Sequence, residues 1–160
     1  MTNKFILEAT RKSRSNILSV TKDFSMEQIN EVPAGFSNNI AWNFAHTVVT
    51  MQLLTYGLSG LDSNLSPEEI QSFKKGSKPE SDMTAEEWAY WKVKSKDCVD
   101  QFELDLAAEK FKDFKIYPTS FGVELGNIQD ALEFNLIHEG MHFGYVLAMR
   151  KSILKETASS

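Results

Sequence analysis

Residues 127–153 read NIQDALEFNLIHEGMHFGYVLAMRKSI, and this stretch decides the fold. Asn127 is suited to cap a helix, and apolar residues and both histidines of the stretch recur after it at spacings of three and four. The row consists of Ile128, Ala131, Asn135, His138, His142, Tyr145, Met149 and Ile153. The stretch therefore predicts a long helix whose inward face carries both histidines.

His138 and His142 are four residues apart, and the chain has one other histidine, His46. Side chains four residues apart lie one above the other on a helix, so these two rings can hold one divalent ion between them. His46 lies in the apolar row of another predicted helix, which can bring it to the same point. A single histidine on an apolar face is more often a hydrogen-bonded core residue. The three together favour a metal site formed by His46, His138 and His142.

Three more long helices are predicted from the same periodicity. The first runs from about Asn3 to Phe24, the second follows the cap-forming residues 37–39 and stops by Gly60, and the third opens with a capping box over 84–87. Their core rows are Ile6, Ala9, Ser13, Ile17, Val20 and Phe24; Trp42, Ala45, His46, Val49, Leu53 and Tyr56; and Trp88, Trp91, Ser95, Cys98, Phe102 and Leu106.

Two long connections separate these helices. Residues 59–83 are polar and contain one short helix that starts at Ser66 and Pro67, whereas the aromatic-rich residues 107–126 suit an irregular crossover that covers a pocket. Connections of this length cross the whole length of a bundle. The sequence thus predicts an all-α four-helix bundle with long crossovers, forming one domain over 1–154 with a frayed tail over 155–160.

Charge and composition exclude some classes of binding partner. The chain has 160 residues and a net charge of -5, and its 17 Lys and Arg are scattered, so we expect no nucleic-acid partner. Neither a signal peptide nor a run of about 18 apolar residues is present, which predicts a cytoplasmic protein without a membrane partner. Cys98, the only cysteine, lies in an apolar row and is expected to be a buried thiol.

Residues 138–142 also read H-E-x-x-H, the signature of zinc peptidases with Glu139 as general base. Only eighteen residues follow His142, and they contain no histidine that could serve as third ligand. The chain also lacks a run of predicted strands to align a peptide. A peptidase is therefore the weakest of the alternatives, and Glu139 is expected to support a ligand or to face solvent.

Two blocks resemble the DinB-like (YfiT-like) metal-binding helical bundles over nearly the whole chain. They are PAGFSNNIAWNFAH at 33–46, with a tryptophan four residues before a histidine, and FGVELGNIQDALEFNLIHEGMHFGYVLAMR at 121–150, with paired histidines. The resemblance implies an up-down-down-up four-helix bundle, often a homodimer. It also implies that His46, His138 and His142 bind zinc or nickel, with iron and manganese as further candidates.

The same resemblance implies several reactions, because characterised relatives include thiol S-transferases, a thiol-dependent maleylpyruvate isomerase and members without known activity. Three neutral imidazoles leave the ion its full charge, so a bound water or thiol is expected to lose its proton near neutral pH. We therefore expect a metal-dependent enzyme, a thiol S-transferase or a hydrolase, acting on a small-molecule substrate with a low-molecular-weight thiol as cosubstrate. The alternative is a non-catalytic metal-binding dimeric bundle.

Several other residues near the histidines have structural roles that explain them without catalysis. Trp42 is expected in the core, at least one of Asn38 and Asn39 as a helix cap, Tyr145 as a buried hydrogen-bonded tyrosine, and Arg150 as a cation that complements the end of its helix. None of them is assigned a catalytic role.

Overall fold

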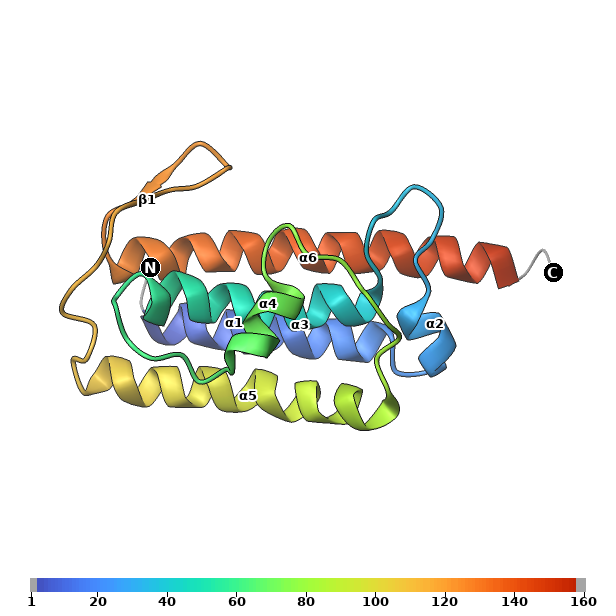
Figure 1. Ribbon diagram of the computed structural model, residues 1–160, viewed down its shortest axis with the longest axis horizontal. Coiled ribbons are helices and arrows are strands. Elements are labelled where there is room, and N and C mark those ends of the chain that lie inside the picture. The colour runs from blue at the N-terminus through green and yellow to red at the C-terminus, as the bar shows by residue number, and fades with distance from the viewer. Residues whose placement is uncertain (1–2, 158–160) are drawn as a thin grey trace.

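The computed structural model describes residues 3–157, with side chains through Lys155. Four long helices lie side by side (Figure 1). In Figure 1, α1 and α6 run from left to right, whereas α3 and α5 run from right to left. Their bounds are α1 Asn3–Val20, α3 Ile40–Gln52, α5 Ala85–Ala107 and α6 Ile128–Thr157, and the π-helical turn η1 Leu53–Gly57 continues α3. The predicted all-α fold is confirmed.

The four long helices enclose the core as a ring. Helix α1 packs against α6 and α5, and α3 packs against the same two helices. One apolar cluster includes Phe44, Trp88 and Met149, and a second one includes Met51, Phe102 and Leu132. Apolar residues therefore fill the bundle on both sides of the level at which the histidines lie.

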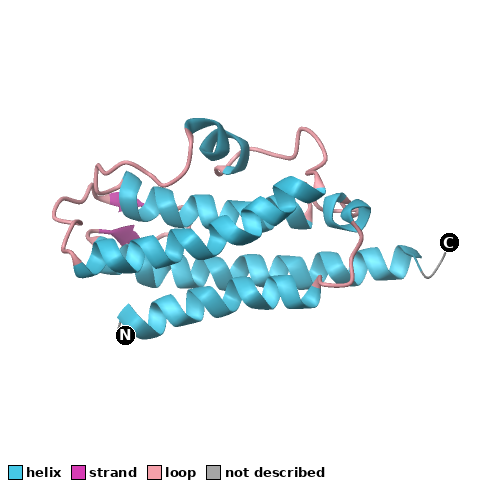
Figure 2. Ribbon diagram, turned by 90° about the horizontal axis from the view of Figure 1, so that it is seen from below, coloured by secondary structure: helices cyan, strands magenta, loops and turns pink. Residues whose placement is uncertain are grey.

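Side-chain caps fix where these elements start, as the sequence predicted. Asn39 accepts a hydrogen bond from the backbone of Trp42, and Asn127 accepts from the backbone of Gln129 and Asp130. Reciprocal capping boxes open α5 at Thr84 and the short helix α4, Pro67–Phe73, at Ser66. Figure 2 shows this short helix outside the bundle, on the long connection between α3 and α5.

The N-terminal region differs from the sequence prediction. Helix α1 ends at Val20, not near Phe24, and a separate short helix α2, Met26–Asn30, follows. It starts with a capping box in which Ser25 and Gln28 bond to each other's backbone. This S-x-x-Q pattern is a helix-start signal, so the sequence itself contains the evidence for a separate short helix.

The second connection and the C-terminus show smaller differences. Residues 108–127 include a two-stranded antiparallel ribbon, β1 Tyr117–Pro118 and β2 Glu124–Leu125, which the sequence did not predict. Helix α6 continues to Thr157, three residues past the expected domain end, and the remainder of the expected tail, 158–160, lies outside the described residues. Within the described part of the chain, no helix combines the length and the hydropathy needed to cross a membrane.

Candidate metal centre

The three histidines predicted as ligands come together between α3 and α6. One ring nitrogen from each of His46, His138 and His142 lies within 4.8 Å of the others. The ring centroids are 4.4 Å apart for the pair on α6, and 5.1 and 4.7 Å from His46 to His138 and His142. The i, i+4 pair stacks along one helix and the third ring faces it from the neighbouring helix, as the sequence predicted.

Two of the rings are held by hydrogen bonds through Nδ1. His46 Nδ1 is 2.6 Å from the carbonyl oxygen of Phe73, at the end of α4, and His142 Nδ1 is 2.8 Å from Oδ1 of Asn43. Both oxygens can only accept, so each Nδ1 carries the hydrogen and each Nε2 presents a lone pair. This arrangement is typical of metal-binding histidines, whose second nitrogen donates to a carbonyl or carboxylate oxygen.

His138 is the least satisfied of the three. Its Nε2 lies 3.1 Å from Nε2 of His142, and its buried Nδ1 has no hydrogen-bond partner among the described residues. Because His142 Nε2 carries a lone pair, a lone pair on His138 Nε2 would face it at contact distance. A proton or a cation between the two nitrogens removes this repulsion. The donor set therefore fits a divalent ion.

Burial keeps the rings neutral. Desolvation, with added repulsion from His142, His46 and Arg14, lowers the pKa of His138 to about 2. Desolvation and the neighbouring His46 lower the pKa of His142 to about 3. Burial also lowers the pKa of His46, although its hydrogen bond to Phe73 acts in the opposite direction. Neutral imidazole is the form that binds a metal, so no proton has to be removed near neutral pH.

Trp42 is part of the core and also part of this site. Its ring stacks on His46 with centroids 4.4 Å apart and planes 12° apart, and its Nε1 donates to Ser77 Oγ at 3.0 Å. The side chain is 5% exposed, as expected for a core residue. The stacking fixes the plane of the His46 ring and shields one side of it from water.

Glu139, the general base of the peptidase alternative, lies in the bundle interior and not at the histidines. Its carboxylate accepts two hydrogen bonds from Arg14, at 2.9 and 2.7 Å, and the side chain is 0% exposed. The expectation of a solvent-facing or ligand-supporting Glu139 is therefore wrong. Since this carboxylate is bound by a buried guanidinium, it is not placed to activate a water at the site.

Arg14 itself was missed by the sequence analysis, which placed Ser13 in the core row of the first helix. Its guanidinium donates to the carbonyl oxygens of Ser95 on α5 and Thr47 on α3, in addition to Glu139 on α6. One side chain thus bonds to all three other long helices. The only sequence signal was its three-and-four spacing from the buried residues Thr10 and Ile17.

A cavity of about 370 Å³ borders His142. It lies between α3, α6 and the loop at 35–38, so the expectation that the crossover at 107–126 covers the site is wrong. Tyr145 lines this cavity and is 49% exposed, where the sequence predicted a buried tyrosine. Asn38 also lines it, whereas Asn39 makes the predicted helix cap.

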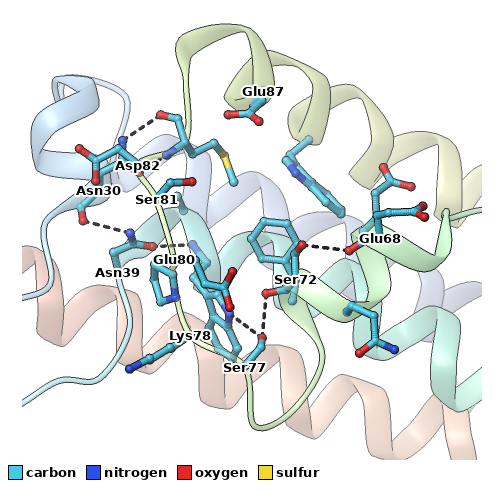
Figure 3. A pocket seen from close by; sticks show the side chains of 18 of the residues that line it. Asn30, Asn39, Glu68, Ser72, Ser77, Lys78, Glu80, Ser81, Asp82 and Glu87 are labelled. Carbon is cyan, nitrogen blue, oxygen red and sulfur yellow. Dashed lines mark hydrogen bonds between the residues drawn. The ribbon is translucent and has the colours of Figure 1, made fainter.

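A larger cavity, of about 580 Å³, lies on the other side of Trp42 and has no histidine in its lining (Figure 3). It runs beneath the connection that carries α4, and five carboxylate residues and one lysine line it together with aromatic rings. Its size alone does not make it the reactive site, because the smaller cavity is the one that borders a member of the histidine cluster, His142.

Arg150 and Cys98 have structural roles that are separate from the histidine cluster. Arg150 donates to the carbonyl oxygen of Val20 at 2.8 Å, so it caps the end of α1 and does not complement the end of its own helix, which continues to Thr157. Cys98 is a buried free thiol, as predicted, and burial raises its pKa to about 11. A neutral buried thiol is a poor nucleophile.

Comparison with protein families agrees with the all-α fold. A family model of the DinB superfamily matches residues 9–146, which include all three histidines. The chain belongs to the DinB superfamily. No individual curated protein matches it. Membership of this superfamily and the three-histidine cluster are together compatible with metal binding and leave the reaction open.

Proposed function

We propose that His46, His138 and His142 bind one divalent metal ion and that the resulting centre acts on a small molecule. The observation that carries this proposal is the orientation of the rings. Phe73 and Asn43 bind Nδ1 of His46 and His142, which leaves each Nε2 as an acceptor. Nε2 of His142 lies 3.1 Å from His138 Nε2, Nε2 of His46 lies 3.3 Å from the Thr50 hydroxyl, and one nitrogen of each ring lies within 4.8 Å of the others. Zinc and nickel are the first candidates and iron the next, because imidazole suits these ions; manganese comes last, because it prefers oxygen ligands.

The reaction proposed is transfer of a low-molecular-weight thiol, or hydrolysis, at this centre. When bound, the ion supplies a Lewis acid that makes a thiol or water more acidic. The protein residues orient the rings, and Trp42 shields His46 from bulk water. The cavity beside His142 gives a small electrophile access to the cluster. The homodimer implied by the sequence resemblance stays a prediction.

Metal analysis of the protein purified without a histidine tag tests the proposal. We expect close to one divalent ion per chain in the wild type and a loss of at least tenfold in affinity in His46→Ala and in His138→Ala. The control Gln129→Ala, at the partly exposed start of α6, should keep the metal. Far-UV circular dichroism should show unchanged helical content in all three variants. Equal metal content in the histidine variants would contradict the proposal.

Turnover is tested separately with a panel of thiols and a generic electrophile, and with ester substrates for hydrolysis. We expect conjugation or hydrolysis that requires the metal and is lost in His138→Ala. A protein that binds metal but turns over no thiol and no ester would instead be the non-catalytic metal-binding bundle. Cleavage of casein is not expected, because Glu139 is bound by Arg14.

A further inference from the structure

The cavity beside His142 has the size and position of a substrate site. Its volume, about 370 Å³, falls in the range of about 300–1,000 Å³ that small-molecule sites occupy. Residues 35–38 form one wall, and His142 and Trp42 belong to another. Because Trp42 stacks on His46 and His142 contacts His138, a molecule in this cavity lies next to the histidine cluster.

The lining of this cavity carries no ionised group. None of the residues that line it is Asp, Glu, Lys or Arg, although such residues make up 24% of the chain. Most of the wall is apolar and comes from Phe36, Trp42, Met141, Tyr145 and Met149. While the histidines hold no metal ion, a charged ligand would lose its hydration here without gaining a counter-ion, which is costly. The cavity therefore favours an uncharged ligand with an apolar part.

One polar atom of the lining needs a partner. The Oδ1 atom of Asn38 is buried and has no hydrogen-bond donor among the described residues. The neighbouring Asn39 differs, because its Oδ1 is used by the backbone of Trp42. A buried acceptor without a donor is unfavourable, so a ligand that brings a hydroxyl or N–H group gains a hydrogen bond at this position.

Two aromatic rings flank the entrance. Phe36 and Tyr145 lie with ring centroids 6.3 Å apart in an edge-to-face arrangement, and Tyr145 is also 6.1 Å from the His142 ring. An aromatic or aliphatic group of a ligand can contact both rings and the Met141 side chain. Contacts of this kind add to the burial of apolar area.

We propose that this cavity is the substrate site of the proposed metal centre and that it selects an uncharged small molecule with an apolar group and one hydrogen-bond donor. The assignment of this cavity as a substrate site rests on the proposed function, because only the proposed metal centre would make a bound molecule react. Phe36, Tyr145 and Met141 contact the apolar group, and Asn38 accepts from the donor. The reactive atom of the ligand then faces His142.

The cavity on the other side of Trp42 strengthens the selection against anions. Glu68, Glu80 and Asp82 surround it, with Lys78 as the one lysine in its lining (Figure 3). Neither cavity that borders Trp42 therefore offers a cluster of cations for a carboxylate or a phosphate. We accordingly expect neither the thiol nor the electrophile to be bound through a carboxylate or phosphate group by the residues that line these two cavities.

Binding of four matched probes to the full chain tests the proposal. Benzyl alcohol has the proposed chemistry, benzoate and benzylamine carry a charge, and benzyl methyl ether lacks the donor. Chemical-shift changes of the Met141 and Met149 methyl groups report binding at the cavity. In the metal-free protein we expect benzyl alcohol to bind at least tenfold more tightly than benzoate or benzylamine, and about fivefold more tightly than the ether.

Three variants sharpen the test. Asn38→Ala should bind the alcohol and the ether equally, since the acceptor is gone. Met141→Lys should gain affinity for benzoate, because it adds a cation to the wall of the cavity. Ile137→Lys, one turn earlier on α6, 53% exposed and outside the lining, is the matched control and should bind benzoate no better than the wild type.

The titrations are run on both metal-free and metal-loaded protein, so that the two proposals fail in different ways. Binding of benzyl alcohol at the cavity without any metal binding by the chain would refute the metal centre and leave the ligand preference intact. Equal affinity for benzoate and benzyl alcohol in the metal-free wild type would overturn the selection for an uncharged ligand, whether or not the protein also binds metal. Shifts outside the cavity alone would also overturn it.

Discussion

Arg14 and Glu139 form an ion pair in the bundle interior, with side chains only 3% and 0% exposed. We expect Arg14→Met to lower the free energy of unfolding by about 3–5 kcal/mol, because it leaves a buried carboxylate without its partner. The double variant Arg14→Met/Glu139→Met should recover most of this loss, since it removes both charges and keeps the volume. Urea unfolding at pH 7 measures all three free energies.

Arg11 provides the control on the same helix. It pairs with Asp100 and Glu103, but all three side chains are at least 33% exposed. Arg11→Met should therefore cost less than about 1 kcal/mol. A loss for Arg14→Met as small as that for Arg11→Met would contradict the assigned role of the buried pair.

The Arg14–Glu139 ion pair could not be predicted from the sequence, whereas the histidine cluster could. The histidines were predictable because four-residue spacing on a helix fixes their relation, and the third histidine completes a known ligand set. Arg14 was not predictable in the same way, because a charged residue is assigned to the surface unless its partner is known. That partner, Glu139, lies 125 residues further along the chain.

Among the elements, the start of α3 positions the site. Asn39 caps this helix through Trp42, donates to the carbonyl oxygen of Asn30, and accepts from Asn43, which in turn binds His142. We expect Asn39→Ala to lower the free energy of unfolding by about 1–2 kcal/mol through loss of the cap. The matched control Asn38→Ala should change it by less than about 0.5 kcal/mol.

Thermal or urea unfolding of the two neighbouring variants gives this comparison directly. Metal affinity should change little in Asn39→Ala, because Asn43, which binds His142, donates to the backbone carbonyl oxygen of residue 39 and the substitution keeps that oxygen. Equal stability of the two variants would mean that the cap contributes nothing at this helix start. Because Asn38 is also the ligand acceptor proposed above, its variant separates binding from stability.

Helix α6 shows the limit of periodicity at the scale of an element. The spacing correctly predicted a helix with the histidines on one face, but it placed Tyr145 in the buried row. Seven residues fall about 20° short of two full helical turns, so Tyr145 is rotated past His138 toward the edge of that face. Whether an edge position is covered depends on a loop that packs there, and here residues 35–38 leave Tyr145 half exposed.

At the scale of the molecule, the caps and core rows predicted the helical bundle, whereas the path of the connections was not predictable. The crossover at 107–126 was expected to cover the site because it is rich in aromatic residues. In the structure, Phe114 packs against Leu125 and Ala131, and Phe111 packs with Phe102, away from the histidines. Aromatic content indicates that a loop packs onto a bundle, but it does not indicate onto which part.

The distribution of the core predicts how the whole molecule responds to metal removal. Apolar clusters lie on both sides of the histidine level and join all four long helices without the histidine side chains. The metal-free protein should therefore stay folded. A bound ion adds only its binding free energy, which is about 2.7 kcal/mol when the free ion is at 100 times Kd.

For a chain of this length, that free energy corresponds to a rise in Tm of about 5–11 °C. We expect a chelator to lower the Tm of the metal-loaded protein by this amount and to leave the far-UV helical signal at 25 °C unchanged. His46→Ala should show at most about half of this shift with metal or chelator, because loss of one of the three ring nitrogens weakens binding at least tenfold. Loss of the helical signal on chelation would instead show that the ion holds the bundle together, since the apolar clusters alone would then be too weak to keep the four helices packed.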